Sequence, residues 1–294
     1  MSVLDIDELF NNDDKIQEQA VKDFILNNYR IFASNGETRL SFETIDGQLY
    51  VNCKAYLELK SEAQSLTNGM FKWGTVNALS ISDSDIQDIS GAPKFVDESF
   101  ILRRTKVQSL KGFPKKCRHF MMAYCYDIFT LEGMENSDCG TLELINGSVT
   151  NLTGCPSNIS NLIITDCERL ENIEDASGNI NEIRIANCDN LRSLKSKVKR
   201  CNLFICNLCP RLTTLQDFNT TCEIFTSNKC KNLIADEYMD EVAGRCGDFK
   251  VNLTRKKASI NYMNRKGGKA DNFNISTVTT MRRNNMYAYK NKKR

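Results

Sequence analysis

The 294-residue sequence contains a single histidine, a single tryptophan and only four prolines. One histidine leaves little material for acid–base catalysis or for a metal site built on imidazole. No apolar run approaches the roughly 20 residues of a membrane-spanning helix. The first residues, MSVLDIDELFNNDD, are acidic where a secretory signal is basic. We therefore expect a cytoplasmic protein with no membrane partner.

Cysteine is abundant, with 13 residues, and the hydrophobic and charged fractions of 41% and 26% are typical of a folded chain. In a reducing compartment these cysteines are expected to be free thiols. Charge is unevenly distributed. Residues 249–294 hold 13 Lys and Arg against one acidic residue, a net charge of +12, and the preceding part of the chain has a net charge of −10.

A 21-residue period organises the middle of the chain. In the first register, apolar residues recur at offsets 0, +2, +7 and +10, with glycine at +12 and, in three units of four, proline at +14. These units begin at Leu79, Phe100, Met121 and Leu142. After Pro156 the phase shifts, and cysteine occupies offset +5. The later units begin at Leu162, Ile183, Phe204 and Phe225, and the pattern fades at Asp236.

This period predicts a solenoid. The two apolar residues at offsets 0 and +2 lie on one face of a short strand. One coil cannot bury its own apolar edge, so neighbouring coils stack at about 4.8 Å and place equivalent positions above each other. We predict an α/β-type or mostly β solenoid of about eight coils with a parallel sheet. A buried cysteine ladder should run through it, formed by Cys167, Cys188, Cys209 and Cys230.

The repeat resembles the leucine-rich repeats of bacteriophage-encoded proteins. Segments such as SLKGFPKK (109–116) and NLTGCPSN (151–158) carry the likeness, and the cysteine ladder is similar to the Asn/Cys position of leucine-rich repeats. The resemblance covers residues 76–236, about half of the chain. It implies an architecture and a phage origin, as a virion component or an adaptor, but it names no partner.

The flanks divide the rest of the chain. Residues 1–75 are predicted to form a helix (residues 13–32) and a hairpin with its turn at Asp46–Gly47, which together cap the solenoid. A short capping helix is expected over residues 237–248, followed by the basic tail, residues 249–294.

Three patterns have a chemical interpretation beside the structural one. The Cys206–Cys209 C-x-x-C motif suggests zinc, but the repeat explains the same residues without a metal. Cys117 and His119 would share a face of a strand and form a nucleophile pair only with an orienting third group. Gly267-Gly268-Lys269 lacks the full phosphate-binding loop motif. We therefore predict no catalytic residue, no metal and no cofactor, and a protein that is not an enzyme.

The outer face of the predicted sheet is unusually apolar. Solvated sheet faces are normally polar, so this face either binds a protein partner or is covered by the flanking segments; we favour the partner. The residues predicted to bind it are Ile101, Phe120, Met122, Tyr124, Ile163, Arg184, Leu203, Ile205 and Ile224.

The basic tail is either a solvated end or a segment that contacts nucleic acid or another acidic surface. Its candidate residues are Arg255, Lys256, Lys257, Arg265, Lys266, Arg282, Arg283, Lys292, Lys293 and Arg294. The sequence thus predicts an interaction or scaffold protein, with a nucleic-acid-binding protein as the alternative.

Overall fold

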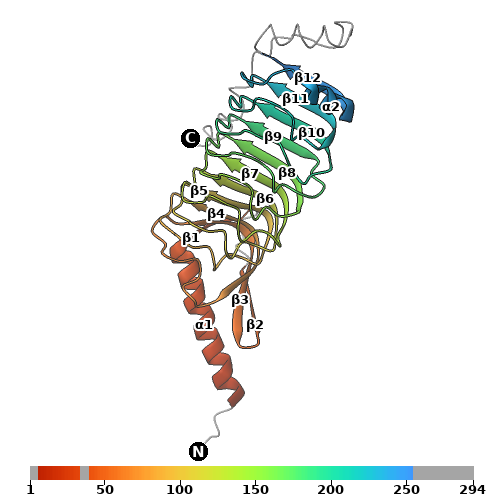
Figure 1. Cartoon of the computed structure of the whole chain (residues 1–294). Coiled ribbons are helices and arrows are strands. Elements are labelled where there is room, and N and C mark those ends of the chain that lie inside the picture. Colours follow the sequence, from red (N-terminus) through yellow and green to blue (C-terminus); the bar gives the residue numbers. More distant parts are fainter. Residues whose placement is uncertain (1–5, 34–39, 254–294) are drawn as a thin grey trace, which may run out of the picture.

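The structure is a computed structural model that describes residues 6–33 and 40–253 (Figure 1). Its elements are α1 (Ile6–Asn28), β1 (Tyr29–Phe32), β2 (Leu40–Ile45), β3 (Gln48–Leu59), β4 (Lys72–Ser82), β5 (Phe95–Arg103), β6 (Lys116–Ala123), β7 (Asp138–Ile145), β8 (Asn158–Thr165), β9 (Glu182–Ala186), β10 (Arg200–Asn207), β11 (Thr221–Asn228), α2 (Glu237–Arg245) and β12 (Cys246–Asn252).

The predicted solenoid is confirmed. Strands β3 to β12 pair in chain order, each parallel to the next, and form one continuous sheet along the molecule (Figure 1). The sequence predicted eight coils, which correspond to β4–β11. The array is longer by β3 and β12, because a hairpin before β3 and a helix before β12 interrupt the 21-residue spacing at both ends.

Two columns of inward side chains run through the solenoid and form its core. The first contains Leu79, Phe100, Phe120, Leu142, Leu162, Ile183, Phe204 and Phe225. The second contains Ile81, Leu102, Met122, Leu144, Ile164, Ile185, Cys206 and Ser227, all buried. We call this second set the second anchor column.

Strand β6 corrects the predicted register. The third unit begins at Phe120 and not at Met121, so Phe120 and Met122 face the core at 0% and 1% exposure. The coil before it has 20 residues and the coil after it 22, and the fixed 21-residue template missed this compensated shift. Phe120 is favoured in the core because its ring stacks on that of Phe100, with 5.6 Å between centroids.

Each strand ends in a residue with a left-handed backbone, which turns the chain out of the sheet. Its φ lies between 47° and 60° in eight successive coils. These residues are Asp83, Arg104, Tyr124, Asn146, Asp166, Asn187, Leu208 and Lys229. Their backbone N–H groups pair with the next coil; that of Asp83, for example, donates to the Arg103 carbonyl at 2.9 Å. Asp and Asn tolerate this conformation best, and they hold four of the eight positions.

The N-terminal cap covers one edge of the sheet. The predicted hairpin is confirmed, with positive φ at both Asp46 and Gly47 as a type I′ turn requires. The predicted helix is displaced: α1 ends at Asn28, and Tyr29–Phe32 forms β1, antiparallel to β3. Strand β1 therefore occupies the hydrogen-bonding edge that would otherwise invite association.

The C-terminal cap is a helix followed by a strand. Asp236 caps α2, its carboxylate accepting a hydrogen bond from the Met239 backbone N–H, and Met239 and Val242 are buried. The helix ends at Arg245, before the predicted 248. Residues Cys246–Asn252, assigned by sequence to the helix end and the tail, add β12 to the sheet. Neither helix of the described chain is long and apolar enough to cross a membrane.

Candidate interaction surface and cysteine cluster

The outer face of the sheet presents most of the residues predicted for it. Ile101, Ile163, Arg184 and Ile205 occupy one outward column, between the two inner columns, and Leu203 and Ile224 occupy the column before it. Ile224 is 40% exposed and Leu203 and Ile205 are half-buried by their neighbours in the stack.

The apolar residues of this face form two groups. Leu203, Ile205 and Ile224 form the first, on β10 and β11, which we call the β10–β11 patch. Ile101, Met121, Ile145 and Ile163 form the second, on β5–β8. Ion pairs lie among them on the same face: His119 Nε2 is 3.0 Å from Glu143 Oε2, and Arg184 pairs with Glu182. The face is a mixed surface and not the continuous apolar stripe that the sequence predicted.

Three of the nine predicted face residues lie elsewhere. Phe120 and Met122 are core residues, and His119 and Met121 take their places on the outer face. Tyr124 is 37% exposed, but it belongs to the left-handed turn column and not to the strand.

An exposed aromatic cluster lies at this turn and was missed by the sequence reasoning. Tyr124, Tyr126 and Phe129 follow β6 in one coil, and Tyr126 and Phe129 are 53% and 46% exposed. The Tyr126 hydroxyl donates to Asn146 Oδ1 at 3.3 Å, and the Arg169 guanidinium lies 5.8 Å from the Phe129 ring. The signal was present in the sequence, but the shifted template placed Tyr126 inside.

The described flanks do not cover the β10–β11 patch. Helix α1 and the β2–β3 hairpin lie at the opposite end of the solenoid (Figure 1). Helix α2 directs Met239 and Val242 into the core. The tail, with all ten of its candidate basic residues from Arg255 to Arg294, lies outside the described residues.

The proposed Cys117–His119 pair does not form. Cys117 points into the core, where its thiol lies 3.6 Å from that of Cys139, and His119 points outward to Glu143. The two residues face opposite sides because Arg118 and His119 both point outward before Phe120 returns to the core, an irregularity of the strand that the sequence does not reveal.

The cysteine ladder is present, and it is longer than predicted. Cys167, Cys188, Cys209 and Cys230 are buried, and Thr105 and Cys125 occupy equivalent positions in earlier coils, 3.5 Å apart. All 13 cysteines are free thiols. Burial raises the pKa of Cys167 to about 11, so its thiol stays protonated at neutral pH.

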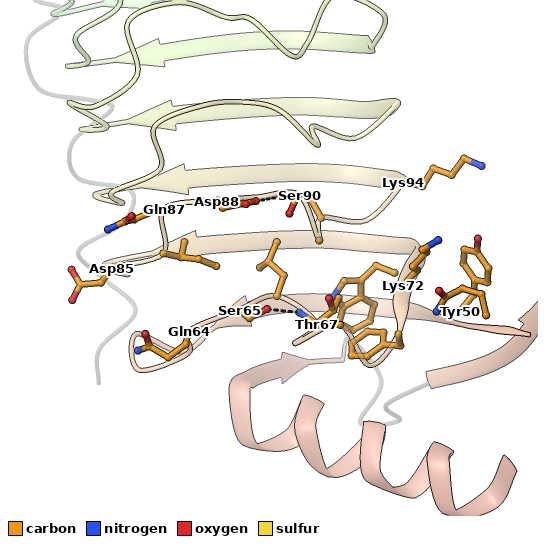
Figure 2. Close-up of a pocket in the computed structure, with 18 residues that line it drawn as sticks. Tyr50, Gln64, Ser65, Thr67, Lys72, Asp85, Gln87, Asp88, Ser90 and Lys94 are labelled. Carbon is orange, nitrogen blue, oxygen red and sulfur yellow. Dashed lines mark hydrogen bonds between the residues drawn. The ribbon is translucent and has the colours of Figure 1, made fainter. Parts of the chain in front are cut away.

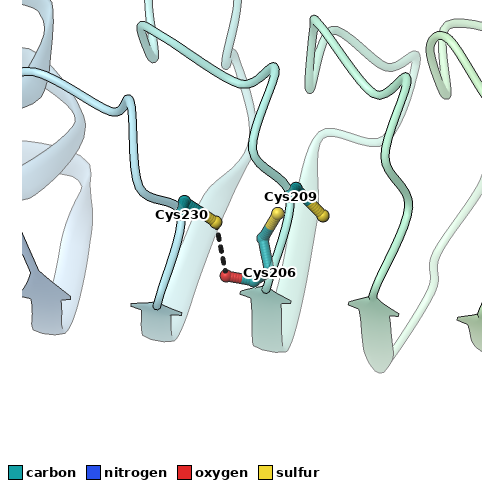
Figure 3. A group of neighbouring side chains, drawn as sticks. All are labelled: Cys206, Cys209 and Cys230. Atoms are coloured by element: carbon teal, nitrogen blue, oxygen red, sulfur yellow. Dashed lines mark hydrogen bonds between the residues drawn. The ribbon is translucent and has the colours of Figure 1, made fainter. Parts of the chain in front are cut away.

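Three thiols converge at one point of this ladder. The sulfur atoms of Cys206, Cys209 and Cys230 all lie within 4.8 Å of one another (Figure 3). The Cys230 thiol donates to the carbonyl of Cys206 at 3.5 Å. Among the described residues, this is the group of side chains whose spacing and chemistry would suit a metal ion.

A groove of about 760 Å³ lies between the loop that precedes β4 and the loop that follows it (Figure 2). Its polar groups are engaged in the local turns: the Ser65 hydroxyl accepts from the backbone of Thr67 and Asn68, and Asp88 accepts from Ser90. Lys72 and Lys94 lie at one end and Asp85 and Gln87 at the other. No histidine or cysteine lines it, so the groove offers no nucleophile–base pair.

These features define a parallel-sheet β-solenoid with a mixed outer face and a thiol-rich core. Searches with the sequence and the structure match no protein-family profile, no curated protein and no solved structure.

Proposed function

We propose that this chain is a non-enzymatic interaction protein, a scaffold or adaptor, and that it binds a folded protein through the outer face of its sheet. The observation that carries the proposal is the β10–β11 patch, where Leu203, Ile205 and Ile224 lie side by side on a face that normally carries polar residues.

The surroundings of the patch suit a protein interface. Protein interfaces typically combine an apolar centre with a polar rim. Here Glu182 and Arg184 border the patch on β9, and Asp248 and Lys250 border it on β12. The rim carries both signs of charge, which favours a partner surface with an apolar projection surrounded by paired charges. The phage-type resemblance of the repeat is consistent with a virion component or a host-acting adaptor.

The test is a binding measurement with purified components. The full chain captures its partner from cells of its source, and the identified partner is then produced separately for titration. Ile205→Glu with Ile224→Glu should weaken binding at least tenfold, because each introduced carboxylate would be desolvated in the interface. The matched control is Ser41→Glu with Thr44→Glu, which adds the same charge at exposed positions of β2. Unchanged binding by the patch variant would refute the proposal.

The alternative is a nucleic-acid-binding protein that acts through the tail, and the net charge of +12 over residues 249–294 favours it. It predicts oligonucleotide binding that weakens steeply between 50 and 200 mM salt, by a factor of about 10³ or more for six phosphate contacts. A chain truncated after Leu253 retains β12 and removes most of that charge. Binding lost with the tail but retained in the patch variant would select this alternative.

A further inference from the structure

The second anchor column changes character near its C-terminal end. In six successive coils the position holds a large aliphatic or thioether side chain: Ile81, Leu102, Met122, Leu144, Ile164 and Ile185. The next two coils hold Cys206 and Ser227 instead, at 0% and 2% exposure. Replacing an aliphatic side chain by a smaller one in a core position normally lowers stability, so this exchange calls for a compensating role.

The exchange places a third sulfur beside the ladder. Cys209 and Cys230 belong to the ladder that runs through the later coils, but Cys206 does not. Its thiol extends from the end of β10 toward both of them, so that a C-x-x-C pair from one coil meets a cysteine from the next (Figure 3). An earlier pair of coils provides the contrast: Cys167 and Cys188 occupy the ladder there, and Ile164 and Ile185 occupy the second anchor column.

Ser227 supplies a second, independent observation. Its hydroxyl oxygen is buried and makes no standard hydrogen bond within the described part of the chain, although it lies beside the Cys230 thiol. Buried hydroxyl groups are normally satisfied, and an unsatisfied one calls for an explanation such as an ion.

We propose that Cys206, Cys209 and Cys230 bind one soft, thiophilic metal ion, with the Ser227 oxygen nearby as a fourth donor. Three sulfurs with no imidazole or carboxylate favour Zn(II) or Cu(I) over harder ions. At Zn–S distances of about 2.3 Å, tetrahedral sulfurs lie roughly 3.8 Å apart, which small rotations of these side chains can reach. Each thiol that ligates the ion releases its proton to solvent, so the ion binds as the thiolates form.

The test is metal binding by the full chain, refolded under a phosphine reductant because the thiols are buried. Zn(II) is measured by elemental analysis after gel filtration, Cu(I) by competition with a chromogenic chelator, and Co(II) by the absorption bands of tetrahedral thiolate ligation. We expect one ion per chain in the Zn(II) or the Cu(I) arm, and a higher Tm in that arm.

Two variants remove ligands with side chains that the solenoid itself uses at these positions. Cys206→Ile restores the aliphatic anchor of the preceding coil, and Cys230→Thr introduces the residue type found at Thr105. Each should lower metal affinity at least tenfold. The control, Cys167→Thr with Cys188→Thr, alters the ladder away from the cluster and should bind as the unmodified chain does. Absence of binding in both the Zn(II) and the Cu(I) arms, or unchanged binding by Cys206→Ile or Cys230→Thr, would overturn the proposal.

Discussion

The ring of Phe204 stacks on the ring of Phe225 in the next coil, with 5.6 Å between centroids and 19° between ring planes. Phe218 packs edge-on against both, at 4.9 and 5.0 Å. This aromatic core lies directly beneath the β10–β11 patch, so adjacent residues of one strand serve opposite faces of the sheet.

Phe225→Ala should lower the free energy of unfolding by about 3–5 kcal/mol, because it removes a fully buried ring that two other rings contact. Ile224→Ala changes the neighbouring outward residue and should alter stability by no more than about 0.5 kcal/mol. Urea unfolding followed by circular dichroism measures both. Equal losses in the two variants would contradict the assignment of inner and outer faces.

Gly178→Ala should destabilise the chain strongly. Gly178 has a φ of +89°, and an added Cβ would lie 1.9 Å from the Ser157 carbonyl oxygen of the preceding coil. We expect a loss of at least about 1–3 kcal/mol from the backbone conformation alone. Gly244→Ala in α2 is the control: its Cβ would meet nothing within 4 Å, and the helix should gain about 0.5–1 kcal/mol. Thermal unfolding should therefore shift in opposite directions for the two variants.

Alkaline pH should unfold the chain partly through its buried thiols. The pKa of Cys167 is raised to about 11 by burial, and an unfolded cysteine titrates near 8.5. A raised folded-state pKa means that its contribution is complete below the unfolded pKa and is lost as the pH rises toward 11. The loss is about 1.4 kcal/mol per pH unit for each such thiol.

Cys167→Ala isolates this effect. The variant has a constant deficit from the missing sulfur below pH 8, but between pH 9 and 11 its stability should fall less steeply than that of the unmodified chain. Urea unfolding at several pH values gives the two slopes. Parallel slopes would show that Cys167 does not titrate differently in the folded and unfolded states.

The repeat made most of the solenoid predictable, because residues such as Leu79 and Ile183 alternate with polar neighbours and fix which side of the strand is buried. Strand β6 defeated the same reasoning. In His119-Phe-Met-Met-Ala123 either phase places apolar residues inside, and only the fit of the Phe120 ring against Phe100 and Phe113 decides between them. That choice also decided that Cys125 lies in the ladder and that Tyr126 lies outside.

The interaction surface was predictable only in part, for a related reason. Leu203, Ile205 and Ile224 follow from alternation within clearly phased strands. The ion pairs of Glu143 and Glu182 depend on which side chains meet across strands, and the Cys206 cluster depends on two coils approaching each other. Sequence spacing alone does not measure such distances between coils.

Serial stacking also gives the molecule a mechanical character. Each coil contacts its two neighbours along the solenoid, so tension applied at α1 and β12 would act on one interface after another. A coil of about 21 residues that unspools would lengthen from the stacking distance of about 4.8 Å to about 70 Å of extended chain. Under load the solenoid would therefore yield stepwise, as an extensible tether whose steps reflect the repeat length.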